Sequence, residues 1–271
     1  SYSAFVYGTY TITELKTEAT RSMKMYTNTF TIDTDGKVLD LGTVNNVPMR
    51  IKTTLVDVNG EHFTEATSTV TLTDHVAYKN LDTDKTYTLT GTLYVKDGDA
   101  LTEMMTETVD FQPTETSGTQ DVTFTFDASE LVGKSVVAFE ELSVNGEFCA
   151  EHKDKDDENQ TVTFPGIQTT ARDNVTEDHV SNATDSITIV DTVAYTDLKK
   201  GDTYTVTGTL MDAETGEAAL DDDGNAITAS KEFTAPSADG SIDITFTFAG
   251  VSLAGKTLVA FEQIDHDGKK Y

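Results

Sequence analysis

The sequence contains very little of several residues on which other protein classes depend. It has no tryptophan, 4 prolines and 1 cysteine, Cys149, so no disulfide can form within the chain. A lone cysteine in a strand-like segment is expected to be a small buried core side chain. No run of 18 apolar residues occurs, so we expect no membrane insertion in this segment.

Basic residues are also scarce. The chain has 19 Lys and Arg against 47 Asp and Glu, giving a formal net charge of -28. Such a chain repels phosphate backbones, so no nucleic-acid partner is expected. The 5 histidines lack metal-ligand spacing, and no nucleotide-binding motif is present, so we expect neither a metal nor a cofactor. The acidic segments 154–159 and 221–226 do not match an EF-hand loop and are interpreted as solvated turns.

Most of the chain consists of threonine-rich segments in which apolar and polar residues alternate. Examples are TYTITEL, STVTLTD, TYTLTGTLYV, DVTFTFD, KSVVAFEEL and TVTFPGI, separated by turns such as KDGD and VNGE. This period of two is typical of β-strands, and no stretch has a helical period. The pattern predicts an all-β chain of short strands, built as immunoglobulin-like or transthyretin-like β-sandwiches.

An internal repeat divides the chain. Residues 74–95 match 191–212, residues 121–142 match 243–264, and residues 50–57 match 166–173. We therefore expect one sandwich over residues 50–165, a second over 166–271, and a shorter unit over 1–49. The junctions NNVP and FPG are too short for flexible linkers, so the units are predicted to form a semi-rigid rod.

The second copy stops earlier than the first. Phe139 and Phe261 are 122 positions apart, so the counterparts of His152 and Gln160 would fall at 274 and 282, beyond Tyr271. The second sandwich is expected to lack its last strand and to remain without a cross-link of its own. Residues 1–49 are expected to be the last strands of a unit, and the whole to be a window within a longer tandem array.

The first repeat resembles the VaFE-repeat modules of Gram-positive surface proteins and the related ester-bond domains of clostridial-type adhesins. The resemblance lies in FTFDASELVGKSVVAFEEL, DHVAY, TGTL and AEHKDKDDENQT. Residues 1–49, with YGTYTITEL and KVLDLGTVNN, resemble the C-terminal part of a collagen-adhesin B-type domain. The resemblance implies a stalk segment of a bacterial adhesin, fibre or pilus, outside the cell and associated with the cell wall. Its expected partners are neighbouring domains of the array and a ligand on a host surface.

Ester-bond domains join a threonine of the first strand to a glutamine of the last strand, with loss of ammonia. The resemblance implies Gln160 as the acyl donor and Thr53 as the nucleophile, with Thr54 as the alternative. Thr53 is preferred because it shares one face of the strand with Ile51 and Leu55. The chain would perform this reaction once, on itself, so it is not expected to be an enzyme.

The same resemblance implies three assisting residues. His152 would move a proton, and Asp74 and Glu140 would form a buried acid pair. A hydroxyl needs a nearby base, and the amide carbonyl needs a donor, for which a carboxylic acid kept protonated by burial is suitable. In the second copy, the residues that retain the pattern are Thr169, Asp191 and Glu262.

The N-terminal unit suggests a second kind of cross-link. Collagen-adhesin B-type domains often join a lysine to an asparagine beside an assisting acid. Glu14 matches the acid, and Asn45 or Asn46 matches the asparagine. Lys16 and Lys24 lie in the wrong part of the pattern, so no lysine partner is assigned.

Simpler interpretations exist for each residue taken alone. A strand threonine is usually only a β-former, a histidine in a charged loop is usually solvated, and a glutamine can cap a turn. Two other functions also remain open. One is a ligand-binding adhesin module that uses loops such as 96–120 or 212–241. The other is a hydrolase or transglutaminase-like enzyme that uses His152.

Overall fold

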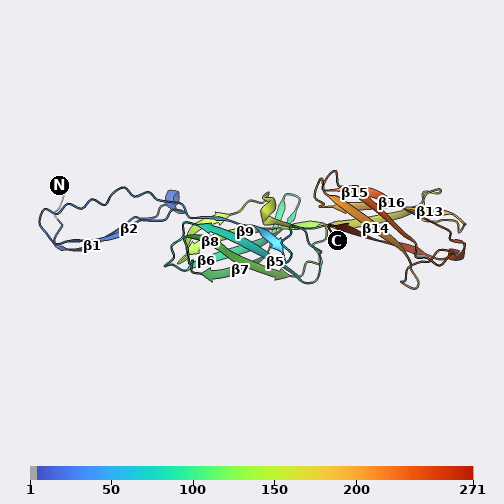
Figure 1. Cartoon of the computed structure of the whole chain (residues 1–271), viewed down its shortest axis with the longest axis horizontal. Helices are drawn as coiled ribbons and strands as arrows, with labels where there is room; N and C mark the ends of the chain where they lie inside the picture. Colours follow the sequence, from blue (N-terminus) through green and yellow to red (C-terminus); the bar gives the residue numbers. More distant parts are fainter. Residues whose placement is uncertain (1–4, 271) are drawn as a thin grey trace.

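The structure is a computed structural model that describes residues 5–270, and it is almost entirely β-strand. Figure 1 shows three units following one another along the longest axis, with a thin N-terminal hairpin and then two thicker bodies. The predicted all-β rod is confirmed. In the described part of the chain, no helix is long and apolar enough to cross a membrane.

The N-terminal unit is a two-stranded antiparallel sheet. Its elements are β1 (Gly8–Thr13), the 3₁₀ turn η1 (Glu18–Thr20) and β2 (Thr27–Ile32). Threonines face each other across the ladder, and the hydroxyls of Thr11 and Thr29 lie 2.9 Å apart. Apolar side chains such as Val6 and Leu15 are exposed, so residues 5–49 form no closed core of their own.

The second unit is a sandwich of two antiparallel sheets. One sheet contains β3 (Arg50–Lys52), β4 (Leu55–Asp57), β5 (Val70–Lys79) and β8 (Ser117–Phe126). The other contains β6 (Tyr87–Asp97), β7 (Ala100–Phe111), β9 (Lys134–Val144), β10 (Glu147–His152) and β11 (Thr161–Phe164), with the 3₁₀ turn η2 (Glu158–Gln160) before β11. Segment 96–120, expected as a loop, is mostly the strands β7 and β8 because its alternating threonines pair in register.

Alternation of side chains builds the core of this sandwich. In β5, every second residue from Val70 to Tyr78 is buried, as expected for a strand with one face on a core. Leu72 and Phe124 of one sheet and Leu89 and Leu142 of the other belong to a single apolar cluster. Burial of these side chains stabilises the sandwich by the hydrophobic effect.

The third unit repeats this architecture. One sheet contains β12 (Gly166–Asp173), β13 (Ile187–Thr196) and β16 (Gly240–Phe248). The other contains β14 (Thr203–Asp212), β15 (Thr228–Thr234), β17 (Leu258–His266) and β18 (Lys269–Lys270), and the 3₁₀ turn η3 (Val251–Leu253) precedes β17. A second apolar cluster, with Tyr204 and Phe246 fully buried, fills the space between these sheets.

The first strand of the second unit is divided at Thr53 and Thr54. Pairing with β5 continues through the gap, because Thr54 and His75 exchange both backbone hydrogen bonds. The amide of Thr53 faces the other way, as alternate residues do in an antiparallel edge strand. Ile51, Thr53 and Leu55 are all buried, as the predicted face requires.

The units contact one another directly. Lys24 forms an ion pair with Asp82, and the guanidinium of Arg21 stacks on the Phe148 ring at 4.1 Å from its centroid. At the second junction, the hydroxyl of Ser135 donates to Asp197 at 3.4 Å. These contacts explain how such short junctions keep the units in line.

Candidate functional site

Two carboxyl groups face each other in the core of residues 50–165. Asp74 lies on β5 and Glu140 on β9, so the two residues come from different sheets, and both are 0% exposed. Gly91 of β6 is the ladder partner of Glu140, and a Cβ at Gly91 would overlap Oε1 of Glu140. The glycine therefore leaves the room that the Glu140 carboxyl occupies.

Burial raises the pKa of Glu140 and that of Asp74, because the core solvates a charge poorly. The negative charge of Asp74 raises the pKa of Glu140 further. Polar contacts of Asp74 with Glu140, the Thr53 hydroxyl and the Thr54 amide lower its pKa and so oppose the effect of burial. In the described part of the chain, neither carboxylate oxygen of Asp74 has a partner with the geometry of a hydrogen bond. Glu140 is therefore held as a neutral acid that can donate a proton.

The hydroxyl of Thr53 faces the imidazole of His152. Thr53 Oγ1 lies 3.3 Å from His152 Nδ1, and the backbone N–H of Thr53 donates to the same nitrogen at 3.2 Å. A ring nitrogen that accepts an N–H carries no proton, so Nδ1 can act as a base toward the hydroxyl. Burial lowers the pKa of His152, which favours the neutral imidazole at physiological pH. The hydroxyl at His152 is thus that of Thr53 rather than that of Thr54.

The side-chain amide of Gln160 is buried and hydrogen-bonded at both its nitrogen and its oxygen. Its Nε2 donates to the carbonyl of Ala138 at 2.7 Å and to that of His152 at 3.0 Å. Its Oε1 accepts from the backbone N–H of Asp154 at 3.2 Å. Thus a backbone amide polarises this carbonyl, where a protonated carboxyl was expected. Gln160 also ends the turn η2 and does not begin the last strand, because Asp157 caps that turn.

This arrangement has the parts of an acyl-transfer site. The ring of His152 contacts the hydroxyl of Thr53, while the backbone carbonyl of His152 holds the amide of Gln160. The candidate nucleophile and the candidate acyl donor therefore both contact His152, and the buried Glu140 lies in the adjacent core. Holding two reacting groups in one place replaces a bimolecular step by an intramolecular one.

The family model of the T-Q ester bond containing domain matches residues 49–164 and, a second time, residues 165–271. The chain belongs to this family. Each match covers one of the two β-sandwiches, which are called T-Q domain 1 (residues 50–165) and T-Q domain 2 (residues 166–271) from here on.

Solved structures also show similarities to this chain of T-Q domains. One is a bacterial adhesin from Mobiluncus mulieris containing intramolecular disulfide, isopeptide and ester bond cross-links, at 14% identity and a TM-score of 0.40 over 81% of this chain and 80% of that one. Another is red sea bream transglutaminase, at 13% identity and a TM-score of 0.31 over 81% of this chain and 29% of that one. Comparison with curated proteins gives no match.

T-Q domain 2 brings together three of the corresponding groups. Thr169 lies on β12, Asp191 on β13 and Glu262 on β17, and Asp191 is fully buried. Burial and then contact with Asp191 raise the pKa of Glu262, while contact with the Thr169 hydroxyl lowers it. Gly208 takes the place that Gly91 has in T-Q domain 1. The acid pair and the threonine are therefore present in both domains.

The N-terminal unit places Asn46 beside Glu14. Nδ2 of Asn46 donates to Glu14 Oε1 at 2.7 Å, whereas Asn45 is exposed. Lys16 and Lys24 lie at the contact with T-Q domain 1, where Lys16 donates to the carbonyl of Phe148 at 3.0 Å. Of the two candidate asparagines, Asn46 is the one that contacts the candidate acid.

One residue of the site was missed in the sequence. Asp157 was interpreted as part of a solvated acidic turn, yet its Oδ2 lies 3.5 Å from Nε2 of His152. The available signal was its position three residues before Gln160, where an aspartate can cap a turn. Several acidic neighbours offered the same signal, so the sequence did not single it out.

Proposed function

We propose that T-Q domain 1 forms an ester between Oγ1 of Thr53 and Cδ of Gln160, once and without another protein. The hydroxyl and the amide condense, the C–N bond of the amide breaks, and ammonia leaves. The observation that carries this proposal is the contact of the Thr53 hydroxyl with an unprotonated nitrogen of His152, on the hairpin that also holds the Gln160 amide.

The residues act in sequence. Nδ1 of His152 takes the proton of the Thr53 hydroxyl as the oxygen attacks the carbonyl carbon of Gln160. The amide N–H of Asp154 stabilises the negative charge that develops on Oε1. The imidazolium then gives its proton to the departing nitrogen, so that ammonia leaves and the base is restored. Glu140, held neutral by burial, is positioned to give a proton to the carboxylate of Asp74, which in turn lies beside the Thr53 hydroxyl.

This ester would join the strands by which the chain enters and leaves T-Q domain 1. β3 follows the N-terminal unit directly, and a single residue, Pro165, separates β11 from β12, with which T-Q domain 2 begins. A pull along the rod would then pass from Thr53 to Gln160 through the ester and leave the hydrogen-bonded core unloaded. This supports the proposal that the chain is a stalk segment of a bacterial surface adhesin, outside the cell.

The same location explains why an ester suits the role. The chain has a single buried cysteine, so it cannot use a disulfide within itself as a tie. An ester between side chains is also unaffected by the thiol reductants that open disulfides. We propose neighbouring units of the same array as its immediate partners, with any host ligand bound elsewhere on the adhesin.

Intact mass spectrometry of the purified full chain tests the reaction. The folded wild type is expected to weigh less than its sequence mass by one ammonia, and Thr53→Ala or Gln160→Ala should restore the full mass. Thr54→Ala is the matched control and should keep the loss. Glu140→Gln should fold but cross-link poorly, since it removes the acid without changing its shape. A folded wild type at full sequence mass would refute the proposal.

A further inference from the structure

Residues 153–157, called the 153–157 turn from here on, carry the N–H group that contacts the side-chain carbonyl of Gln160. This N–H belongs to Asp154 and donates to Oε1 of the glutamine at 3.2 Å. The ladder of β10 with β9 ends at His152, and the ladder of β11 with β9 begins at Thr161. The turn lies between these two ladders, so the direction of the Asp154 N–H depends on contacts other than sheet pairing.

One peptide unit of the turn, the one that joins Lys155 to Asp156, is held from two sides. Its N–H donates to Oδ1 of Asp154 at 3.0 Å. Its carbonyl accepts a hydrogen bond from Nζ of Lys96 at 3.0 Å. Lys96 lies near the end of β6, and its side chain is 25% exposed. A rotation of this peptide unit would break both contacts, so the ammonium of Lys96 fixes the group to which the side chain of Asp154 is bonded.

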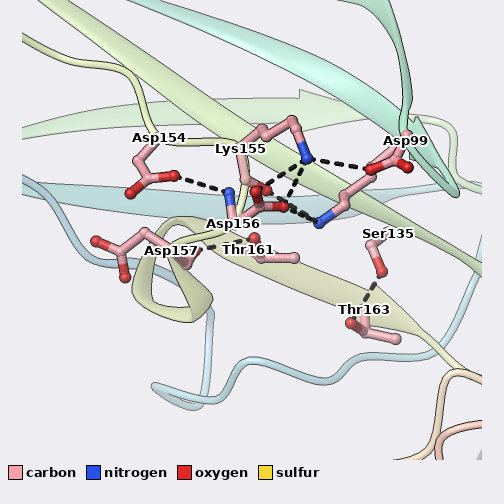
Figure 2. Close-up of polar contacts among 9 residues, drawn as sticks. Asp99, Ser135, Asp154, Lys155, Asp156, Asp157, Thr161 and Thr163 are labelled. Atoms are coloured by element: carbon pink, nitrogen blue, oxygen red, sulfur yellow. Dashed lines mark hydrogen bonds and ion pairs between the residues drawn. The ribbon is translucent and has the colours of Figure 1, made fainter.

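The other lysines at the turn make contacts of a different kind. Figure 2 shows the ammonium of Lys155 in contact with the carboxylates of Asp99 and Asp156, at 3.1 Å and 2.9 Å. Lys153 pairs with surface carboxylates of β9 and β10. Exposed ion pairs of this kind contribute little to the stability of a conformation. Among the described residues, Lys96 is the lysine whose ammonium binds the backbone of the turn.

We propose that Lys96 is a positioning residue of the ester-forming site, which holds the 153–157 turn with the N–H of Asp154 toward Oε1 of Gln160. This inference rests on the proposed ester formation and adds a residue to it. In the described part of the chain, the hydrogen bonds of the Lys96 ammonium go to the turn and not to the reacting groups. A donor that is already in place when charge develops on the carbonyl oxygen stabilises that charge without reorganisation.

The ammonium of Lys96 also acts on the junction with T-Q domain 2. Burial raises the pKa of Asp197, and the positive charge of Lys96 opposes this rise. Ser135, the ladder partner of Lys96 on β9, donates to Asp197 at 3.4 Å. Loss of Lys96 would therefore change the junction as well as the turn. Asp197→Asn changes the junction alone, and asparagine tolerates the positive φ of 57° at this position.

The rate of ester formation tests the proposal. The full chain is made by cell-free synthesis, and the fraction that has lost ammonia is followed by intact mass. Lys96→Met keeps the apolar stem of the side chain and removes the ammonium. It is expected to slow the reaction about 10-fold, less than the roughly 100-fold or greater effect of losing such a donor outright, because the turn still visits the productive position. Lys153→Met, with the same change of charge, and Asp197→Asn should react as the wild type.

A second measurement separates this proposal from the ester itself. In the Thr53→Ala chain, which cannot react, NMR follows hydrogen exchange of the Asp154 N–H. Adding Lys96→Met should speed this exchange about 10-fold, because one hydrogen bond that holds the turn is lost. The N–H of Thr163, which donates to the carbonyl of His62 on the far side of β11, should exchange as before and so report an intact sandwich.

Three outcomes would overturn the role of Lys96. The first is an unchanged exchange rate of the Asp154 N–H in Lys96→Met. The second is an equal rate of ester formation in Lys96→Met and Lys153→Met. The third is an Asp197→Asn chain as slow as Lys96→Met, which would assign the effect to the junction. A wild type that loses no ammonia refutes the ester, while the exchange of the Asp154 N–H still decides whether Lys96 holds the turn.

Discussion

The two T-Q domains share the acid pair but differ in the surroundings of the last strand. In T-Q domain 1, β11 lies between β9 and the loop after β4, where Thr163 exchanges backbone bonds with His62 and Thr64. In T-Q domain 2, the corresponding loop residues 179–181 and the start of β17 line a groove of about 980 Å³. Val137 of β9 is 0% exposed, whereas its counterpart Val259 is 43% exposed.

This difference shows that the site has two separable halves. Asp191 is as deeply buried as Asp74, although the groove beside it is open. The described residues of T-Q domain 2 bring the acid pair and the threonine together, but Glu262 and Thr169 are only half-buried, whereas Glu140 and Thr53 are fully buried. The hairpin of T-Q domain 1 adds His152 as the proposed base and Gln160 as the proposed acyl donor, with the carboxylate of Asp157 beside the ring of His152.

The largest expected effect comes from filling the groove of T-Q domain 2. Tyr271 corresponds to Cys149 by the repeat offset of 122, so residues 150–164 can be appended after Tyr271 to rebuild the hairpin. The extended chain is expected to lose two ammonia molecules instead of one, as measured by intact mass. Thr169→Ala in the extended chain should reduce the loss to one. A folded extended chain that loses only one would show that the groove does not accept the strand.

The next effect is on stability. Thr53→Ala should lower the free energy of unfolding of T-Q domain 1 by about 4 to 5 kcal/mol, by analogy with a disulfide that closes a loop of roughly 100 residues. The loss arises because the unfolded chain regains the freedom that the closed loop removed. Urea unfolding, with limited proteolysis to assign each transition, measures it. Thr54→Ala is the control. An equal loss of stability in both variants would mean that the packing of the threonine methyl group, and not the ester, accounts for the effect.

The smallest effect is on the pH dependence of stability, compared in the Thr53→Ala chain so that both domains are uncross-linked. Burial raises the pKa of Glu140 from 4.5 to about 9 and that of Glu262 from 4.5 to about 8. Above pH 4.5 the unfolded chain releases protons that the folded chain keeps, so stability falls as pH rises toward the folded pKa. T-Q domain 1 should therefore lose stability over a wider pH range than T-Q domain 2. Urea midpoints against pH measure this, and Glu140→Gln should flatten the curve of T-Q domain 1 alone.

The core half of the site could be predicted from the family resemblance, which implied Asp74 and Glu140, together with strand periodicity and the internal repeat. The alternation of buried residues placed Thr53 beside Ile51 and Leu55, and the repeat paired Glu140 rather than Glu141 with Glu262. In the structure, Glu140 is buried, while Glu141 pairs with Lys153 at 2.9 Å at the surface. Successive side chains of a strand point to opposite faces, so the face that a residue occupies follows from its position in the sequence.

The hairpin half could be predicted only in part, because a loop of polar residues has no such period. His152 and Gln160 were identified through the family resemblance, but the amide N–H of Asp154 at the Gln160 carbonyl was not. Backbone donors carry no signal in the sequence, and their direction depends on how the turn is capped. The same reason hid Asp157 among four other acidic residues in positions 151 to 158.

The course of the chain at the two ends of T-Q domain 1 has a topological consequence. The chain enters through β3 and leaves through β11, which runs past Pro165 into β12. With the proposed ester in place, residues 53–160 form a closed ring, and the rest of the chain is attached to this ring only at Thr53 and at Gln160. A protease that cuts one loop of this ring, such as the turn between β7 and β8, opens the ring but does not sever the rod. Two cuts would only release a fragment, and the covalent path from one neighbour to the next would remain.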